Sequence, residues 1–227
     1  MILKNISPKY AGIVDGTYHI AHYHPTSKNH HDDTSSHLLD FKDNVEPWVS
    51  RWSNISVKYL GGEITPDIIV RVLSSGETEA SSSNSLDFLG QRMEEAMAPA
   101  RYIPTTLKKS RPTKPLKTLR TKQEREAELA GVYSYIPPAG IGSDNKVILI
   151  LDDIVTSGTT LREISRAIRT ASPTSKLYFF ALGQTYDSWA NNDPDNTEVL
   201  KVLTEKKALK ITYSNNTSPI VSQETDA

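Results

Sequence analysis

The stretch that decides the fold is Lys146–Ile164, KVILILDDIVTSGTTLREI. Its five apolar residues, 147–151, have the length of a buried strand, and two carboxylates, Asp152 and Asp153, follow at once. A short loop of small and hydroxylated residues comes next, and apolar residues then recur at helical spacing. The stretch therefore predicts a strand, a loop and a helix, with two acids where the strand ends.

The loop after the acids has the composition of a phosphate-binding site. Gly158 permits positive φ and a close backbone approach, and a helix starting near Thr160 would turn its positive dipole end toward the loop. Two adjacent carboxylates repel each other, so we expect a cation or a set of donors beside them. Sugar hydroxyls could donate hydrogen bonds to the two carboxylates, and a bound Mg²⁺ could neutralise them. In the plainer alternative, the acids lie in a solvated turn and a threonine caps the helix.

Strands and helices alternate in most of the remaining chain. After residue 60, strands are expected at Asp67–Leu73, Lys146–Leu151 and Lys176–Leu182, and helices at Ser85–Ala98, Lys122–Ala130 and Thr160–Ala171. This alternation favours an α/β fold with a parallel sheet covered on both faces. Ligands of such sheets bind beyond the carboxyl ends of the strands. Ala208–Tyr213 is a further candidate, for an edge strand, and residues 214–227 are expected to form a flexible tail.

The string DDIVTSGTT resembles the motif that binds 5-phosphoribosyl 1-diphosphate (PRPP) in type I phosphoribosyltransferases. That motif has apolar residues, two acids, two mostly aliphatic residues and then Thr-Ser/Thr-Gly-x-Thr. Further segments are similar to the ComF-like branch of the family: IIVRVLSSGE (68–77), LKKSRPTKPLKTLRTKQERE (107–126) and GVY (131–133). The resemblance spans about residues 67–186. It departs at the N-terminus, because ComF-like proteins usually begin with a cysteine-rich zinc module and this chain has no cysteine.

The resemblance implies a Rossmann-like, parallel-sheet core and a role for each segment. Asp152 and Asp153 would hold the ribose 2′- and 3′-hydroxyls and are candidate Mg²⁺ ligands. The 5′-phosphate would lie against Thr156, Ser157, Gly158, Thr159 and Thr160. The pyrophosphate, with Mg²⁺, would lie against Arg71, Ser74, Ser75, Gly76, Lys108, Lys109 and Arg111. Catalysis would then depend on neutralising pyrophosphate and placing a nitrogenous acceptor, and Asp153 is a candidate for moving a proton.

Positive charge concentrates in residues 101–126, which hold nine Lys/Arg and two Asp/Glu, whereas the whole chain has a formal charge of −1. With three prolines, this segment is expected to form a long exposed arm. Three roles stay open for it: a solvated loop, an arm that closes over PRPP and excludes water, or a contact for nucleic acid. The lack of interleaved aromatic residues for base stacking weakens the third role.

Residues 1–60 are expected to form a β-rich hood region attached to a phosphoribosyltransferase-like domain at 61–213. The strand candidates are Tyr10–Val14 and Thr17–Ala21, joined by a two-residue hairpin turn at Asp15-Gly16, and His37–Lys42. A short helix is expected after Pro47, because proline suits the first helical turn. The hood, together with residues 135–141 and 184–187, would form the rim that reads the acceptor.

All six histidines lie between His19 and His37. His22 and His24 would share one face of a strand, with Asp32 and Asp33 nearby. Such donors bind zinc when three or four of them converge, but the spacing does not fix convergence. Metal binding, substrate contact and a structural role therefore stay open for these histidines.

Composition narrows the class of protein further. The absence of cysteine excludes disulfides and thiolate zinc sites and suits a reducing cytoplasm. The N-terminus lacks the apolar core of a signal peptide, and no run approaches the ~18 apolar residues of a membrane span. We therefore expect a cytoplasmic protein without membrane contact.

Two functions fit the sequence. The first is a Mg²⁺-dependent phosphoribosyltransferase, expected to be a homodimer, or a variant enzyme that acts on a nucleotide instead of PRPP. The second is a PRPP or nucleotide sensor, effector or scaffold that keeps binding without turnover, since a fold does not fix a function.

Overall fold

The computed structural model describes residues 2–26, 31–186 and 193–205, and the backbone of 211–212 and 220–221. Its centre is a six-stranded sheet in the order β1-β2-β8-β7-β3-β4. The strands are β1 (Lys4–Asn5), β2 (Gly16–Tyr23), β3 (Ile68–Arg71), β4 (Arg101–Tyr102), β7 (Val147–Val155) and β8 (Lys176–Thr185). β1 is antiparallel to β2, and all other neighbours are parallel. The predicted α/β class, with a mostly parallel, Rossmann-like sheet, is confirmed.

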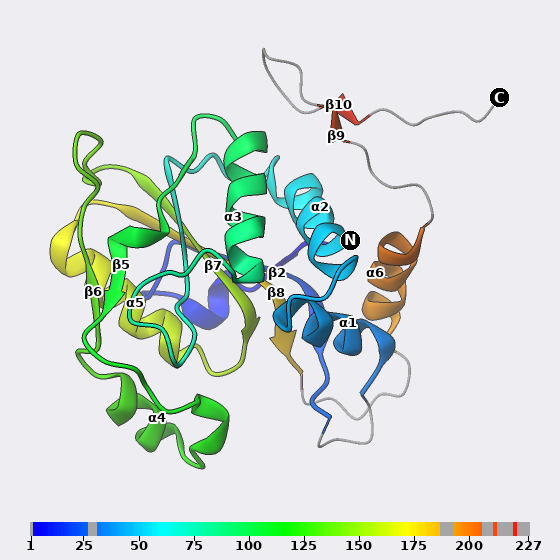
Figure 1. Cartoon of the computed structure of the whole chain (residues 1–227), viewed down its shortest axis with the longest axis horizontal. Coiled ribbons are helices and arrows are strands. Elements are labelled where there is room, and N and C mark those ends of the chain that lie inside the picture. Colours follow the sequence, from blue (N-terminus) through cyan, green and yellow to red (C-terminus); the bar gives the residue numbers. More distant parts are fainter. Residues whose placement is uncertain (1, 27–30, 187–192, 206–210, 213–219, 222–227) are drawn as a thin grey trace.

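Helices cover both faces of this sheet (Figure 1). One face carries α1 (Asp33–Lys42), α2 (Trp48–Leu60), α3 (Ser85–Ala96) and α6 (Pro194–Thr204), whose apolar residues form one core with Leu149, Leu151 and Phe180. The other face carries α5 (Thr159–Ala171), whose apolar residues pack on Ile148, Ile150 and Phe179. α4 (Lys122–Leu129) contacts α5. Both cores follow from the alternation of side chains along each strand.

Strand β7 runs beyond its expected end at Leu151, through both carboxylates to Val155. Its pairing with β8 continues to Val155, which lies opposite Gln184. Because successive side chains of a strand point to opposite faces, Asp152 belongs to the α5 face of the sheet and Asp153 to the α1 face. Their neighbours agree, since Asp153 contacts Lys42 of α1.

The expected basic arm is anchored by a second ladder. β5 (Leu107–Lys109) pairs antiparallel with β6 (Tyr133–Tyr135), and the chain between them contains the short helix η3 (Leu116–Thr118) and α4. A capping box between Thr121 and Glu124 starts α4. The remaining short elements are η1 (Ser7–Tyr10), η2 (Pro104–Thr106) and a separate pair, β9 (Ile211–Thr212) with β10 (Ile220–Val221). The arm is thus tied to the body of the protein at both ends.

The prediction of a β-rich N-terminal region is wrong. β2 belongs to the central sheet, and α1 occupies the expected strand His37–Lys42. No hairpin turn forms at Asp15, because Asp15 exchanges hydrogen bonds with the backbone of Leu177 and starts β2 alongside β8. α1 forms because Asp32 caps its first turn, with Oδ1 accepting from the Ser35 amide at 2.7 Å.

Two other expectations fall near the end of the chain. The candidate edge strand at 208–213 lies mostly outside the described residues, and its residues 211–212 form β9, which pairs with β10 instead of the central sheet. The expected tail at 214–227 also lies outside the described residues, apart from β10. Within the described part of the chain, no helix has the length and apolar character needed to cross a membrane.

Candidate functional site

The loop between β7 and α5 has the local geometry that the sequence predicts. Gly158 is the N-cap of α5 and has a φ of 73°, a left-handed conformation that glycine adopts without strain. Thr156 Oγ1 lies 2.9 Å from Thr185 Oγ1 at the end of β8, and Ser157 Oγ lies 2.9 Å from Thr159 Oγ1. The hydroxyls and the free amides of the first helical turn thus gather where a helix favours an anion. Thr160 lies in that first turn.

Tyr10, which the sequence analysis did not assign, closes the back of this loop. A Cβ added to Gly158 would lie 2.4 Å from Tyr10 Cε1, so the ring needs glycine at this position. The Tyr10 hydroxyl is buried, with no hydrogen-bond partner among the described residues. Burial and the negative charge of Asp152 raise the pKa of Tyr10 to about 12. Nothing local in the sequence marks this contact between residues far apart in the chain.

Asp152 lies on the same face as Tyr10. Its Oδ1 accepts a hydrogen bond from the Asp153 amide at 2.9 Å. Burial, together with the charge of Asp153, raises the pKa of Asp152 well above its usual range. Burial and the charge of Asp152 also raise the pKa of Tyr133, whose hydroxyl donates to the Leu73 carbonyl at 3.2 Å. Asp152 is therefore partly buried, beside two tyrosines.

Asp153 is paired with a lysine from α1. Lys42 Nζ lies 2.5 Å from Asp153 Oδ2, and the Lys42 side chain keeps 52% of its surface exposed. Burial lowers the pKa of Lys42, but the charge of Asp153 and the hydrogen bond to it outweigh burial, so the pKa is raised. The compensating cation expected beside the two acids is therefore Lys42, a residue that the sequence analysis had placed in a strand.

The two carboxylates do not form a magnesium cage by themselves. They face opposite sides of the sheet, and Lys42 already neutralises Asp153. Among the described residues, the group of three His, Asp or Glu donors within 4.8 Å of one another is His22, Asp193 and Asp195, which includes neither acid of the motif. The protein side of the site thus does not fit Mg²⁺ without oxygens from a ligand.

The loop after β3 was expected to bind pyrophosphate through Ser74, Ser75 and Gly76, and it is organised by Glu77. Glu77 Oε2 accepts from the Ser74 amide at 2.7 Å and from its hydroxyl at 2.6 Å. Burial raises the pKa of Glu77, but its hydrogen bonds with Arg71, Ser74 and Ser81 outweigh burial and hold that pKa well below its usual range. Glu77 therefore accepts the hydrogen bonds that Ser74 was expected to donate to a ligand.

Arg71 is placed differently from its expected role at the pyrophosphate. Its side chain is fully buried and donates to Glu77 Oε1 at 2.7 Å, to Glu77 Oε2 at 2.9 Å and to Asp87 Oδ1 at 2.9 Å. Two further bonds reach the carbonyls of Val72 and Ser81. These bonds use all the N–H groups of a guanidinium. Arg71 therefore holds the loop from inside and has no donor left for a ligand.

Of the expected lysines and arginines of the arm, Lys109 meets the β3 loop. Its Nζ donates to the Ser74 carbonyl at 2.7 Å, and burial lowers the pKa of Lys109 to about 8. Lys108 instead pairs with Glu79 at 2.8 Å, and Arg111 pairs with Glu128 at 2.7 Å. These two cations are therefore engaged with acids of the chain itself.

The two loops lie at one edge of the sheet. β3 and β7 are parallel neighbours, with Arg71 opposite Leu151, so their carboxyl ends meet there. Tyr133 lies near both, since its hydroxyl binds the Leu73 carbonyl and the charge of Asp152, together with burial, raises its pKa. The structure thus brings together Asp152, the hydroxyl loop, the β3 loop and Lys109.

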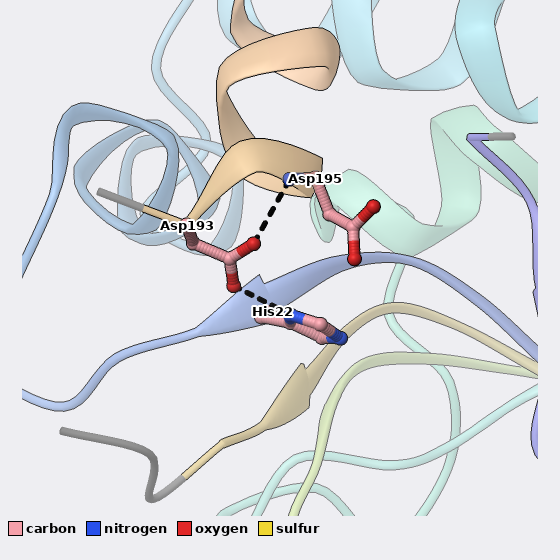
Figure 2. Close-up of side chains that lie close together, drawn as sticks. All are labelled: His22, Asp193 and Asp195. Carbon is pink, nitrogen blue, oxygen red and sulfur yellow. Dashed lines mark hydrogen bonds and ion pairs between the residues drawn. The ribbon is translucent and has the colours of Figure 1, made fainter. Parts of the chain in front are cut away.

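A second polar cluster lies at the carboxyl end of β2, and Figure 2 shows its three central residues. His22 Nδ1 lies 2.5 Å from Asp193 Oδ2, and His24 Nε2 lies 3.3 Å from the same oxygen. Asp193 also caps α6 through Oδ1. The Tyr186 ring stacks on His22 with 4.4 Å between ring centres. The convergence of these histidines on Asp193 was not predictable from their spacing.

Of the other histidines, His19 lies next to the cluster, with 5.4 Å between its ring centre and that of His22, whereas His31 and His37 have other partners. His37 Nδ1 lies 3.1 Å from Asp40 Oδ2, and the His37 ring stacks on Trp48. His31 Nδ1 lies 2.7 Å from the His24 carbonyl. His30 is outside the described residues. Asp32, expected near a metal, caps α1.

The fold and the site together define an α/β protein whose β7–α5 loop has a geometry suited to an anion. This loop lies at the edge of the sheet where the carboxyl ends of the parallel strands meet. No protein-family model matches this chain, and no curated protein gives a significant match. A functional interpretation therefore depends on the chemistry of the two polar clusters.

Proposed function

We propose that this chain binds a ribose 5-phosphate group, in PRPP or in a nucleotide, and that it is a Mg²⁺-dependent phosphoribosyltransferase. The observation that carries this proposal is the segment 152–160, in which two acids lie in the last part of β7 and a hydroxyl loop leads into α5 at Gly158. A 5′-phosphate at this loop would meet free backbone amides and the positive end of the helix dipole. The ribose hydroxyls would then lie near the carboxyl end of β7, where Asp152 and Asp153 offer acceptors.

For the transfer reaction, the protein has to neutralise the leaving pyrophosphate and position the acceptor nitrogen. The bond between ribose C1′ and pyrophosphate breaks, and a bond from C1′ to an acceptor nitrogen forms, while the acceptor loses a proton. Lys109 offers a positive charge beside the β3 loop, where the leaving group would lie. Mg²⁺ would be held mainly by the oxygens of pyrophosphate, because the described residues do not gather their own set of ligands around Asp152.

A thermal-melting experiment tests the binding part of this proposal. Ribose 5-phosphate and PRPP are expected to raise the melting temperature of the wild-type chain, whereas ribose is not, since the phosphate supplies the charge that the loop recognises. Thr160→Val, in the first turn of α5, is expected to reduce the shift. Thr170→Val, at the other end of the same helix, is the matched control and should leave the shift unchanged. Equal shifts with ribose and ribose 5-phosphate would count against a phosphate cradle.

The position of Glu77 favours a second candidate function, in which the chain binds a ribose phosphate without turning it over. Ser74 donates both its amide and its hydroxyl to Glu77, and Arg71 is engaged with the same carboxylate. A pyrophosphate at this loop would have to displace Glu77. Release of pyrophosphate from PRPP in the presence of nitrogenous acceptors distinguishes the two: release supports the transferase, and binding without release supports a sensor or effector.

A further inference from the structure

The second polar cluster suggests a function that the phosphosugar site does not use. We propose that His22, Asp193 and Asp195 form a binding site for a divalent transition-metal ion of the Zn²⁺ type. One donor atom from each residue lies within 4.8 Å of the other two. His22 comes from β2. Both aspartates come from the start of α6, and their carboxylates point toward the His22 ring (Figure 2). Donors that converge from distant parts of a chain are what a metal site requires.

The donors are held in place by their surroundings. The Asn196 side chain accepts from the His22 amide at 2.9 Å and donates to the His22 carbonyl at 2.8 Å, which fixes β2 to α6. Asp193 Oδ1 accepts from the amides of Asp195 and Asn196, so Oδ2 is left facing His22. Outer contacts of this kind orient metal ligands and set their affinity.

His24 lies beside these three donors but is not a member of the group within 4.8 Å, and the three donors themselves define the class of ion. The His24 Nε2 lies 3.3 Å from Asp193 Oδ2, and the His24 side chain is 4% exposed. An imidazole with two carboxylates suits Zn²⁺ and its first-row neighbours, whereas Mg²⁺ and Ca²⁺ prefer all-oxygen ligand sets. The Asp195 side chain is 39% exposed, so an ion can reach the cluster from solvent.

Lys4 provides a charge that a metal ion would have to replace. Its Nζ forms an ion pair with Asp195, while the two imidazoles contact Asp193. The Lys4 ammonium group and a divalent cation bound to Asp195 would repel each other, because both are positively charged. Removal of the Lys4 charge should therefore strengthen metal binding, an effect that a purely structural His22–Asp193 pair would not produce.

Zn²⁺ titration by calorimetry, with metal analysis after dialysis, tests this proposal on the full chain without a histidine tag. The wild type is expected to bind a single Zn²⁺ per chain. His22→Gln and Asp193→Asn should each weaken binding by about tenfold or more, and asparagine keeps the helix cap. His37→Gln removes a histidine outside the cluster and should leave affinity unchanged. Lys4→Met should tighten binding.

Three results would overturn the proposal. The first is a wild-type chain that binds no Zn²⁺. The second is an equal loss of affinity in His22→Gln and His37→Gln, which would indicate scattered surface binding. The third is an unchanged affinity in Lys4→Met, which would remove Asp195 from the site. Lys4→Met alters neither histidine nor aspartate, so it tests the proposal even if Asp193→Asn does not fold. No phosphosugar enters the experiment, so its outcome is independent of the proposed transferase function.

Discussion

Lys42 Nζ lies 2.5 Å from Asp153 Oδ2, so the last residue of α1 neutralises an acid of the β7 motif. The position at the C-terminal end of a helix favours a cation. Asp152, on the other face of the strand, lies beside buried tyrosines, and burial and the charge of Asp153 outweigh the charge of Lys42 and raise its pKa. The two adjacent acids therefore have different environments, and a ligand hydroxyl that reaches Asp153 meets an ion pair.

Replacement of Lys42 tests whether this ion pair belongs to the binding site. Because the lysine is half exposed, Lys42→Met should change the free energy of unfolding by no more than about 1 kcal/mol. It should nevertheless weaken binding of ribose 5-phosphate, and Lys42→Arg should restore part of it. Lys58→Met, on an exposed position of α2, is the control. Calorimetry that gives equal affinities for Lys42→Met and Lys58→Met would exclude Lys42 from the site.

Gly158 should be sensitive to substitution for two separate reasons. Gly158→Ala places a Cβ against the Tyr10 ring and forces alanine to a φ of 73°. Gly140→Ala is a matched control, because Gly140 has a φ of 78° and open space around its Cα. Backbone strain alone should cost about 1–2 kcal/mol at either position, and the clash should add to it only at Gly158. Urea unfolding measures both; equal losses would mean that Tyr10 does not pack on the loop.

The buried arginine network should dominate the stability of the β3 loop. Arg71→Met would leave the buried Asp87 and the partly buried Glu77 without their cation, which should cost about 3–5 kcal/mol in the free energy of unfolding. Arg111→Met breaks a surface pair and should therefore cost far less. If Arg71→Met is as stable as the wild type and loses only ligand affinity, Arg71 is a ligand residue after all.

Lys109 should make stability depend on pH in a defined window. Burial lowers its folded-state pKa to about 8, from an ordinary value of 10.5. Between these values the unfolded chain binds more protons than the folded one, so the free energy of unfolding should rise with pH from about 8. The raised pKa of Tyr10, whose ordinary value is 10.0, opposes this rise above pH 10. Chemical denaturation between pH 8 and 10 should show a rise in the wild type that is absent in Lys109→Met; parallel curves would contradict this assignment.

The fold was predictable where its signals are local. The strand, loop and helix at 146–171 follow from an apolar run, a glycine and helical spacing, all within one stretch. The segment His37–Lys42 was misassigned because its apolar residues fit a strand as well as a helix. The packing of Leu38 and Phe41 in the core with α2 and α6 decides between them. Such packing depends on distant residues and cannot be read locally.

The site was predictable to a smaller degree for the same reason. The hydroxyl loop is one continuous segment, so its place between β7 and α5 was predictable. Tyr10, Lys42 and Glu77 reach their places through η1, α1 and the turn after β3, and no local pattern marks them. The internal partners of Arg71 were not predictable, because an arginine beside a serine-rich loop has the same sequence appearance whether it faces a ligand or two internal acids.

Calorimetric titration of PRPP with Mg²⁺ tests the central claim most directly, because that claim places a ribose phosphate at the segment 152–160. The wild type should give saturable binding, and the double variant Asp152→Asn/Asp153→Asn should lose it while keeping a cooperative unfolding transition. Glu95→Gln, an exposed acid of α3, should bind as the wild type does. No binding by the wild type at millimolar PRPP, or unchanged binding by the double variant, would contradict the account.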